Sequence, residues 1–192
     1  MINRIILASN SPRRRQLLEG IGLSFEVIPP DSELLPVTTM SPAENAMVSA
    51  LDKAHQVASL ESSGIIVAAD TIVVKAGRIL GKPTDPEDAR AMLRFLSGQA
   101  HEVITGLAVI DIASGREETA AETTKVIFRH LDEHAIQKYV ASGEPLDKAG
   151  AYGIQGLGAL LVKRIEGCYF NVVGLPLVLL GEQLQKFGIN LL

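Results

Sequence analysis

Near its N-terminus the chain reads Ile5-Ile6-Leu7-Ala8-Ser9-Asn10-Ser11-Pro12-Arg13-Arg14-Arg15, and in this stretch a strand gives way to a helix. The four apolar residues at 5–8 are typical of a short buried strand. Ser11 is a good N-cap, and Pro12 suits the first helical position because its missing N–H costs nothing there. The buried face of the helix is expected to consist of three apolar residues, Leu17, Leu18 and Ile21.

The arginines in the first turn of this helix predict a bound anion. Positive side chains at a helix N-terminus oppose the helix dipole, but they become favourable when an anion lies against the backbone N–H groups and the guanidinium groups. We expect Arg13 and Arg14 to contact a phosphate, since Arg14 shares a helix face with Leu17 and Leu18. Arg15 is expected to be a solvent-exposed charge.

Length and composition limit the possible functions. The 192 residues suit one domain, which could consist of two lobes. The 18 Lys and Arg against 22 Asp and Glu give a net charge of −4. This balance argues against nucleic-acid and anionic-membrane partners. Cys168 is the only cysteine, so an internal disulfide and multi-cysteine metal motifs are excluded, and a reducing cytoplasm is expected. No apolar run approaches the roughly 20 residues of a membrane helix, and the first apolar run is too short for a signal peptide.

A carboxylate interrupts an otherwise apolar run. The run Ile65–Ala69 is typical of a strand covered on both faces and continues through Ile72–Val74, with Asp70-Thr71 between the two parts. Burying a carboxylate there costs several kcal/mol unless a cation, a metal or strong donors meet it. A structural Asp70 bonded to backbone amides is one interpretation. We favour a metal ligand or general base held on a rigid element.

The remaining signals predict an α/β chain with a mixed, largely buried sheet. Cap residues and proline predict helices that begin after Ser41, Asp85 and Asp132, and a last helix from about Pro176. The first of these runs to about Leu60, and the second turns three residues inward, Ala91, Leu93 and Leu96. Further strands are predicted at 25–28, 103–110, 123–128 and 159–162, with a hairpin at 77–81.

Several charged residues on separate elements could meet phosphates and a metal. They are Arg13, Arg14, Lys53, Asp70 and Lys82. The segment 143–158 holds five of the chain's 17 glycines, so it is expected to approach a ligand with its backbone and with the polar side chains Asp147, Lys148 and Gln155. These features favour an enzyme that acts on a phosphorylated small molecule. His101 is expected to be a surface or hydrogen-bonded histidine, and Glu33 alone a solvated loop residue.

At Ala8–Arg14 the sequence resembles the Maf family of nucleoside triphosphate pyrophosphatases. The likeness recurs in order at five further segments, 69–71, 81–83, 97–106, 147–150 and 173–176. It implies one Maf-like domain over 1–192, with a mixed, elongated, twisted sheet flanked by helices in two lobes around a central cleft. Such a fold is similar to the inosine triphosphate pyrophosphatases and is often dimeric.

The resemblance implies hydrolysis of a nucleoside triphosphate between its α and β phosphates. Asp70 matches the proton acceptor, and Glu33 with Asp70 would hold Mg²⁺ or Mn²⁺. Lys53 and Lys82 match family lysines that would stabilise charge on the phosphates. Ser9, Arg13 and Arg14 belong to the motif that would bind substrate.

Three positions resemble the family branch that hydrolyses dTTP and UTP, namely Arg13, Thr71 and Gln155. The branch that acts on 7-methyl-GTP carries tryptophan, glutamine and glutamate there. A glutamine amide can donate to a pyrimidine carbonyl and accept from its imide N–H, whereas glutamate only accepts. Ala68 departs from the glycine common before Ala-Asp-Thr in the family, which we do not expect to abolish activity.

Three alternatives stay open at this point. The chain could be a non-catalytic nucleotide-binding regulator of cell division, but the presence of Asp70, Lys53 and Lys82 argues against this. It could be an RNA-binding module, which the net acidity and the 4% aromatic content disfavour. It could also catalyse the same reaction with another base preference, such as 7-methyl-GTP.

Overall fold

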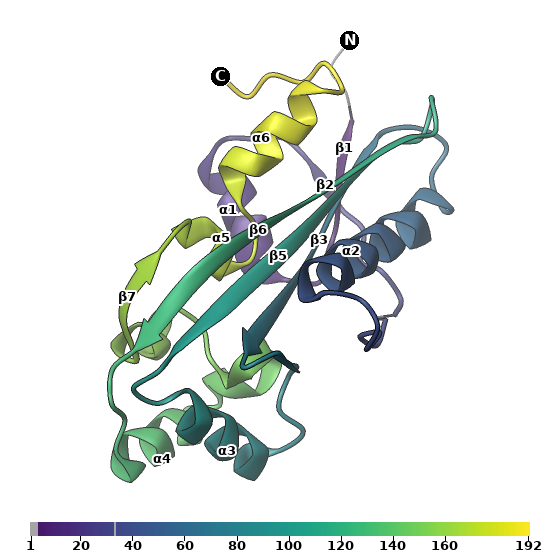
Figure 1. Cartoon of the computed structure of the whole chain (residues 1–192). Helices are drawn as coiled ribbons and strands as arrows, with labels where there is room; N and C mark the ends of the chain where they lie inside the picture. The colour runs from purple at the N-terminus through teal and green to yellow at the C-terminus, as the bar shows by residue number, and fades with distance from the viewer. Residues whose placement is uncertain (1–3, 33) are drawn as a thin grey trace. The chain divides into compact units, whose positions relative to one another are not determined.

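The computed structural model describes residues 4–32 and 34–192 of an α/β protein with a mixed sheet (Figure 1). The strand order is β2-β1-β3-β5-β6-β7, and β4 pairs with β3. The strands are β1 (Ile5–Ala8), β2 (Glu26–Val27), β3 (Ile65–Lys75), β4 (Arg78–Leu80), β5 (Ala100–Asp111), β6 (Arg116–Phe128) and β7 (Val162–Glu166). The helices are α1 (Pro12–Gly20), α2 (Pro42–Ala58), α3 (Pro86–Leu96), α4 (Glu133–Ala141), α5 (Tyr169–Val173) and α6 (Leu177–Gln185). Three short 3₁₀ helices are η1 (Glu144–Asp147), η2 (Ala149–Ala151) and η3 (Gly156–Leu160). The α/β class and the mixed sheet are confirmed.

The chain divides into two compact units. Unit 1 comprises Met1–Asp70, Thr105–Glu122 and Gly174–Leu192, and unit 2 comprises Thr71–Ile104 and Thr123–Val173. Strands β3, β5 and β6 contribute residues to both units. The interpretation of 1–192 as one domain stays a prediction.

In unit 1 the sheet is covered on both faces. Strand β1 runs parallel to β2 and β3, and its side chains alternate between two cores. Ile5 and Leu7 pack with Leu18 of α1 and with α6, while Ile6 and Ala8 pack with α2. Figure 1 shows α2 on one face of these strands and α1 and α6 on the other. This double burial explains why β1 and the first half of β3 are continuous apolar runs.

Helix α2 lies unusually close to strand β5. A Cβ placed on Gly106 would lie 2.3 Å from the carbonyl carbon and oxygen of Ala46 and 2.5 Å from the backbone N of Met47. Real Cβ atoms do not approach backbone this closely, so glycine is required at this position for α2 to pack where it does. The capping box predicted at the start of α2 is present, since Ser41 and Glu44 bond each other's backbone N–H.

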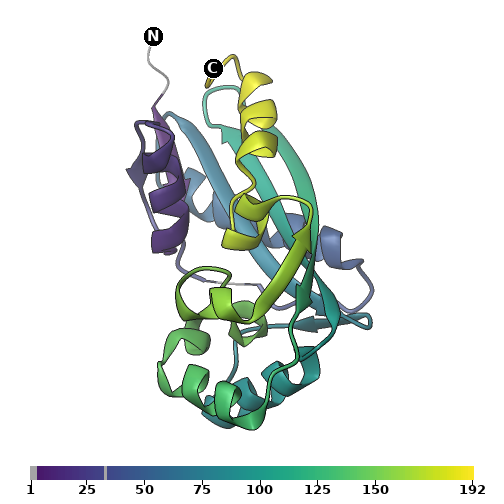
Figure 2. The same ribbon diagram turned by 90° about the vertical axis from the view of Figure 1, so that its left-hand side faces the viewer.

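Unit 2 holds two antiparallel strand pairs and two neighbouring helices. The predicted hairpin joins β3 and β4, and β6 pairs with β7. Figure 2 shows α3 and α4 side by side. Its core includes His101, Phe128 and Tyr152, whose rings meet edge to face at centroid distances of 4.6 to 5.3 Å.

Three expectations at the level of single elements are wrong. Ile21 is 44% exposed because α1 ends at Gly20. Ala91 is exposed, and Ala89 is buried instead because it lies four residues before Leu93 on the same helix face. The strand predicted at 159–162 is mostly the 3₁₀ helix η3, and β7 begins only at Val162. The turn chemistry of Gly156 and Gly158 outweighs the apolar pattern there.

Candidate active site

Asp70 and Lys53 form an ion pair in unit 1. The Lys53 Nζ donates to the Asp70 Oδ1 at 2.5 Å, and the two side chains are 6% and 20% exposed. Lys53 reaches this position because the neighbouring residues of α2, Ala50 and Ala54, are buried against β1 and β3. The desolvation cost of the carboxylate is therefore met by an ammonium group. The pair occupies rigid elements, and Asp70 keeps partial access to solvent.

Arg14 is buried and held at the N-terminal end of α1. Its Nε donates to the Gly174 carbonyl at 2.8 Å, and its Nη1 donates to the Ser9 Oγ at 3.3 Å. The same Ser9 Oγ accepts from the backbone N of Ser11 at 3.1 Å. Ser11 is the N-cap as predicted, but its side chain makes no cap hydrogen bond, and the first turn of α1 has no acidic residue. The chain thus brings Ser9 and Arg14 together in an arrangement suited to an anion.

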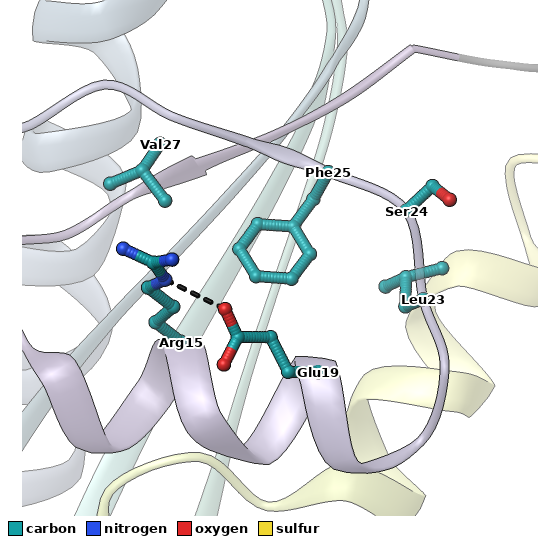
Figure 3. Close-up of a pocket in the computed structure, with 6 residues that line it drawn as sticks. All are labelled: Arg15, Glu19, Leu23, Ser24, Phe25 and Val27. Atoms are coloured by element: carbon teal, nitrogen blue, oxygen red, sulfur yellow. Dashed lines mark hydrogen bonds and ion pairs between the residues drawn. The ribbon is translucent and has the colours of Figure 1, made fainter.

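The other two arginines of α1 differ in exposure. Arg13 is half-buried, whereas Arg15 is exposed and pairs with Glu19 at 2.7 Å. Arg15 thus takes the solvated role expected of it. Arg15 and Glu19 also line an open surface pocket of about 510 Å³, together with Leu23, Ser24, Phe25 and Val27 (Figure 3). None of the predicted site residues within 4–32 and 34–192 lines this pocket.

Three predicted site residues belong to unit 2. Thr71 follows Asp70 on β3 and is half-buried, and Lys82 is exposed just after β4. The carbonyl of Gly81 accepts from the backbone N of Gly150 at 2.9 Å, so the Lys82 segment is tied to the glycine-rich segment 143–158. Gln155 is exposed and stands at the N-cap of η3 without a side-chain cap hydrogen bond. The meeting of these residues with those of unit 1 stays a prediction.

A metal site in this chain would have few carboxylate ligands. Glu33 lies outside the described residues, and within residues 4–32 and 34–192 no group of three His, Cys, Asp or Glu side chains could hold a metal ion. Mg²⁺ usually takes one or two protein carboxylates and completes its shell with water and substrate phosphates. Asp70, whose side chain is 20% exposed and offers hard carboxylate oxygens, fits that chemistry.

His101 is buried and hydrogen-bonded, as one of the two expected roles requires. Its Nε2 lies 2.7 Å from the Tyr152 Oη. Burial lowers the pKa of His101 to about 4, with a further contribution from the positive charge of Lys75. The imidazole is therefore neutral near pH 7, and it is part of the unit 2 core.

Sequence reasoning missed the residues that hold the site residues in place. Gly174, whose carbonyl orients Arg14, lies in the Val173–Pro176 segment, but its contact spans 160 positions of chain and has no local signal. Glu144 and Tyr139, which bond the loop around Gln155, were missed as well. The glycines at 153, 156 and 158 were the only local sign of close packing there.

The described part of the chain contains no helix that is both long and apolar enough to span a membrane.

Comparison with known proteins gives long matches. Residues 4–187 match the family described as Maf-like protein. A Pelotomaculum thermopropionicum protein named dTTP/UTP pyrophosphatase is 50% identical over 191 residues, which cover 100% of both chains. A Moorella thermoacetica protein of the same name is 50% identical over 189 residues, covering 98% of this chain and 97% of its own.

A solved dITP/XTP pyrophosphatase structure from Mycobacterium abscessus aligns with 67% of this chain and 75% of its own. Its identity is 18% and its TM-score is 0.42, a likeness too weak to carry a conclusion. The family match spans nearly the whole chain, and the relatives match over nearly their full length. This chain therefore belongs to the Maf family.

Proposed function

We propose that this chain is a nucleoside triphosphate pyrophosphatase that converts dTTP and UTP to the nucleoside monophosphate and pyrophosphate. Relatives that bear this name are about half identical to it over their full length. The observation that carries the proposal is the Lys53–Asp70 pair at 2.5 Å, a carboxylate held on a strand and compensated by a buried ammonium. Such a carboxylate has the position and surroundings of a general base.

In the proposed reaction Asp70 takes a proton from the attacking water. The water oxygen forms a bond to phosphorus, the α–β phosphoanhydride bond breaks, and pyrophosphate leaves. Because Lys53 occupies Oδ1, we assign the proton transfer to Oδ2 of Asp70. The Lys53 ammonium keeps the carboxylate oriented, and it also lies where it can offset charge that develops on the phosphates.

The phosphates are assigned to the N-terminal end of α1. Ser9, Arg13 and Arg14 would contact them, and the Gly174 carbonyl orients the Arg14 guanidinium for this contact. A guanidinium held by a backbone carbonyl loses less side-chain entropy when the anion binds. Lys82, exposed at the end of β4, would neutralise the leaving pyrophosphate.

Asp70 and Glu33 would hold a divalent cation, Mg²⁺ or Mn²⁺. When bound, such an ion polarises phosphate oxygens and lowers the pKa of bound water. Asp70 supports this assignment because it combines carboxylate oxygens with partial exposure. The lysines and arginines of the chain would then share the remaining phosphate charge.

Base selection is assigned to Gln155, with Thr71 and Arg13. A glutamine amide complements the adjacent acceptor and donor of a uracil or thymine edge. We also propose a cytoplasmic location, because a single cysteine is typical of proteins in a reducing compartment. We propose a homodimer on the basis of the family resemblance.

The test is pyrophosphate release from dTTP, UTP, CTP, GTP and 7-methyl-GTP, each with Mg²⁺ or Mn²⁺ and again with EDTA. We expect release that favours dTTP and UTP and that stops when the metal is chelated. Preference for 7-methyl-GTP would contradict the base assignment and keep the reaction. Nucleotide binding without release would instead favour a non-catalytic regulator, and salt-sensitive RNA binding would favour an RNA-binding module.

A further inference from the structure

The loop that carries Gln155 is closed at both ends. The backbone N of Gly153 donates to the Tyr139 Oη at 3.2 Å. A Cβ on Gly158 would lie 2.0 Å from the Gly153 carbonyl oxygen and 2.8 Å from the same Tyr139 Oη. The two glycines therefore meet beside one hydroxyl group, and Gln155 lies in the short loop between them.

Glu144 caps the 3₁₀ helix that begins after Gln155. Its Oε1 accepts from the backbone N of Leu157 at 2.9 Å, and its Oε2 accepts from that of Gly158 at 3.3 Å. Gly156 has a φ of +61°, and a Cβ there would lie 2.5 Å from the Glu144 Oε1. Glycine at 156 is what lets the carboxylate reach the helix end.

This cap leaves the Gln155 amide available to a ligand. The residue at an N-cap ordinarily uses its own side chain to accept from the first N–H groups of the helix. Gln155 occupies the N-cap of η3, makes no such bond and is exposed. The Glu144 carboxylate accepts these hydrogen bonds instead of Gln155, so the Gln155 amide is not used to cap η3.

Glu144 is itself fixed in the same segment. The Lys148 Nζ donates to the Glu144 carbonyl at 2.5 Å and to the Asp147 Oδ1 at 2.6 Å. A Cβ on Gly153 would lie 3.0 Å from the Lys148 side-chain carbons, so the lysine stem runs against the start of the loop. One network thus joins the anchor of Glu144 to both ends of the Gln155 loop.

We propose that Glu144, with Tyr139, is a positioning residue for base recognition, and this inference rests on the proposed function. A glutamine amide carries its oxygen and its NH₂ side by side, so it discriminates among base edges only while both groups stay within hydrogen-bond distance of the base. A fixed loop holds the Gln155 backbone in one place and so keeps the amide at that distance, where a mismatched base edge leaves a donor or acceptor unpaired. Loosening the loop weakens the discrimination before it weakens the chemistry.

The test compares Glu144→Gln and Tyr139→Phe with Glu166→Gln in steady-state kinetics on UTP and CTP. Glu166 is an exposed glutamate of unit 2 paired with Lys125 and Arg164, so its variant makes the same chemical change away from the loop. For Glu144→Gln and Tyr139→Phe we expect KM for UTP to rise about tenfold, which corresponds to the loss of one hydrogen bond. We expect kcat to change less than about threefold. The UTP to CTP ratio of kcat/KM should fall, and Glu166→Gln should match wild type.

Two results would overturn the role of Glu144 and leave the proposed function standing. One is a wild-type UTP to CTP ratio in both loop variants, and the other is an equal loss of kcat on both nucleotides with KM unchanged. Thermal unfolding of each variant identifies loss of the fold, and an unfolded Glu144→Gln leaves Tyr139→Phe as the deciding variant. Absence of release by the wild-type enzyme would instead overturn the proposed function and this inference with it.

Discussion

At the scale of single residues, the proposed chemistry depends on one buried ion pair. Replacing Asp70 with Asn keeps the shape of the side chain and an oxygen for Lys53, but it removes the proton acceptor. We expect hydrolysis to fall roughly a hundred- to ten-thousand-fold, the usual contribution of a general base. Folding should be retained, with at most about 3 kcal/mol lost from the free energy of unfolding. Pyrophosphate release and thermal unfolding measure the two effects, and near-normal turnover would contradict the role given to Asp70.

Gln155 permits a second test at this scale. Glu in its place can only accept hydrogen bonds, so Gln155→Glu should lower kcat/KM for UTP about tenfold or more while GTP is affected less. The measurement is the ratio of kcat/KM for the two nucleotides. An equal loss on every base would show that Gln155 is structural, since its exposed side chain would then matter only for the loop.

At the scale of elements, the distance between α2 and β5 determines where Lys53 lies. Gly106→Ala would bring a Cβ to 2.3 Å from the backbone of Ala46, and backbone cannot move aside as a flexible side chain can. We expect about 3 kcal/mol or more of destabilisation by denaturant unfolding. Activity should fall as well, because the shifted helix carries Lys53 away from Asp70.

Gly20→Ala is the matched control for this change. A Cβ on Gly20 meets no atom within 4 Å, and alanine favours the helical conformation there. Its free energy of unfolding should stay within about 1 kcal/mol of wild type. A Gly106→Ala protein as stable as this control would show that α2 can be displaced from the sheet without cost.

At the scale of the whole molecule, stability should depend on pH through His101. Burial lowers the pKa of His101 from 6.5 to about 4, so between these values the unfolded chain binds a proton that the folded chain excludes. Stability is therefore complete above pH 6.5 and falls as the pH drops toward 4, by about 3 kcal/mol for this shift. Urea unfolding at pH 7, 5.5 and 4.5 measures the slope.

His101→Phe isolates this contribution, because phenylalanine fills the ring position between Phe128 and Tyr152 and does not titrate. The variant loses the hydrogen bond to the Tyr152 hydroxyl, so it should be less stable at pH 7. Its stability should nevertheless change less between pH 6.5 and 4.5 than that of wild type. Equal slopes in the two proteins would assign the acid sensitivity to other groups.

Neighbouring residues of the chain were enough to predict most local elements and to single out the residues able to carry chemistry. The apolar run of β1, the proline start of α1, the capping box of α2 and the Asp70 interruption of β3 are all written in neighbouring residues, and each was predicted. Cap bonds and strand burial depend on contacts a few positions apart, which is why they can be read locally. The predicted ends of elements were wrong where turn glycines outweighed an apolar pattern, as at η3.

The contacts that these residues make depend on how distant elements pack together. The pairing of Lys53 with Asp70 spans 17 positions, and the bond from Arg14 to Gly174 spans 160. Glycine is required at position 106 only because α2 packs directly against it. Such contacts arise when distant elements bury shared apolar surface, and no local pattern encodes which polar atoms then face each other. The cap that Glu144 provides for the Gln155 loop is of the same kind, because it depends on a packed arrangement of glycines that the sequence marks without explaining.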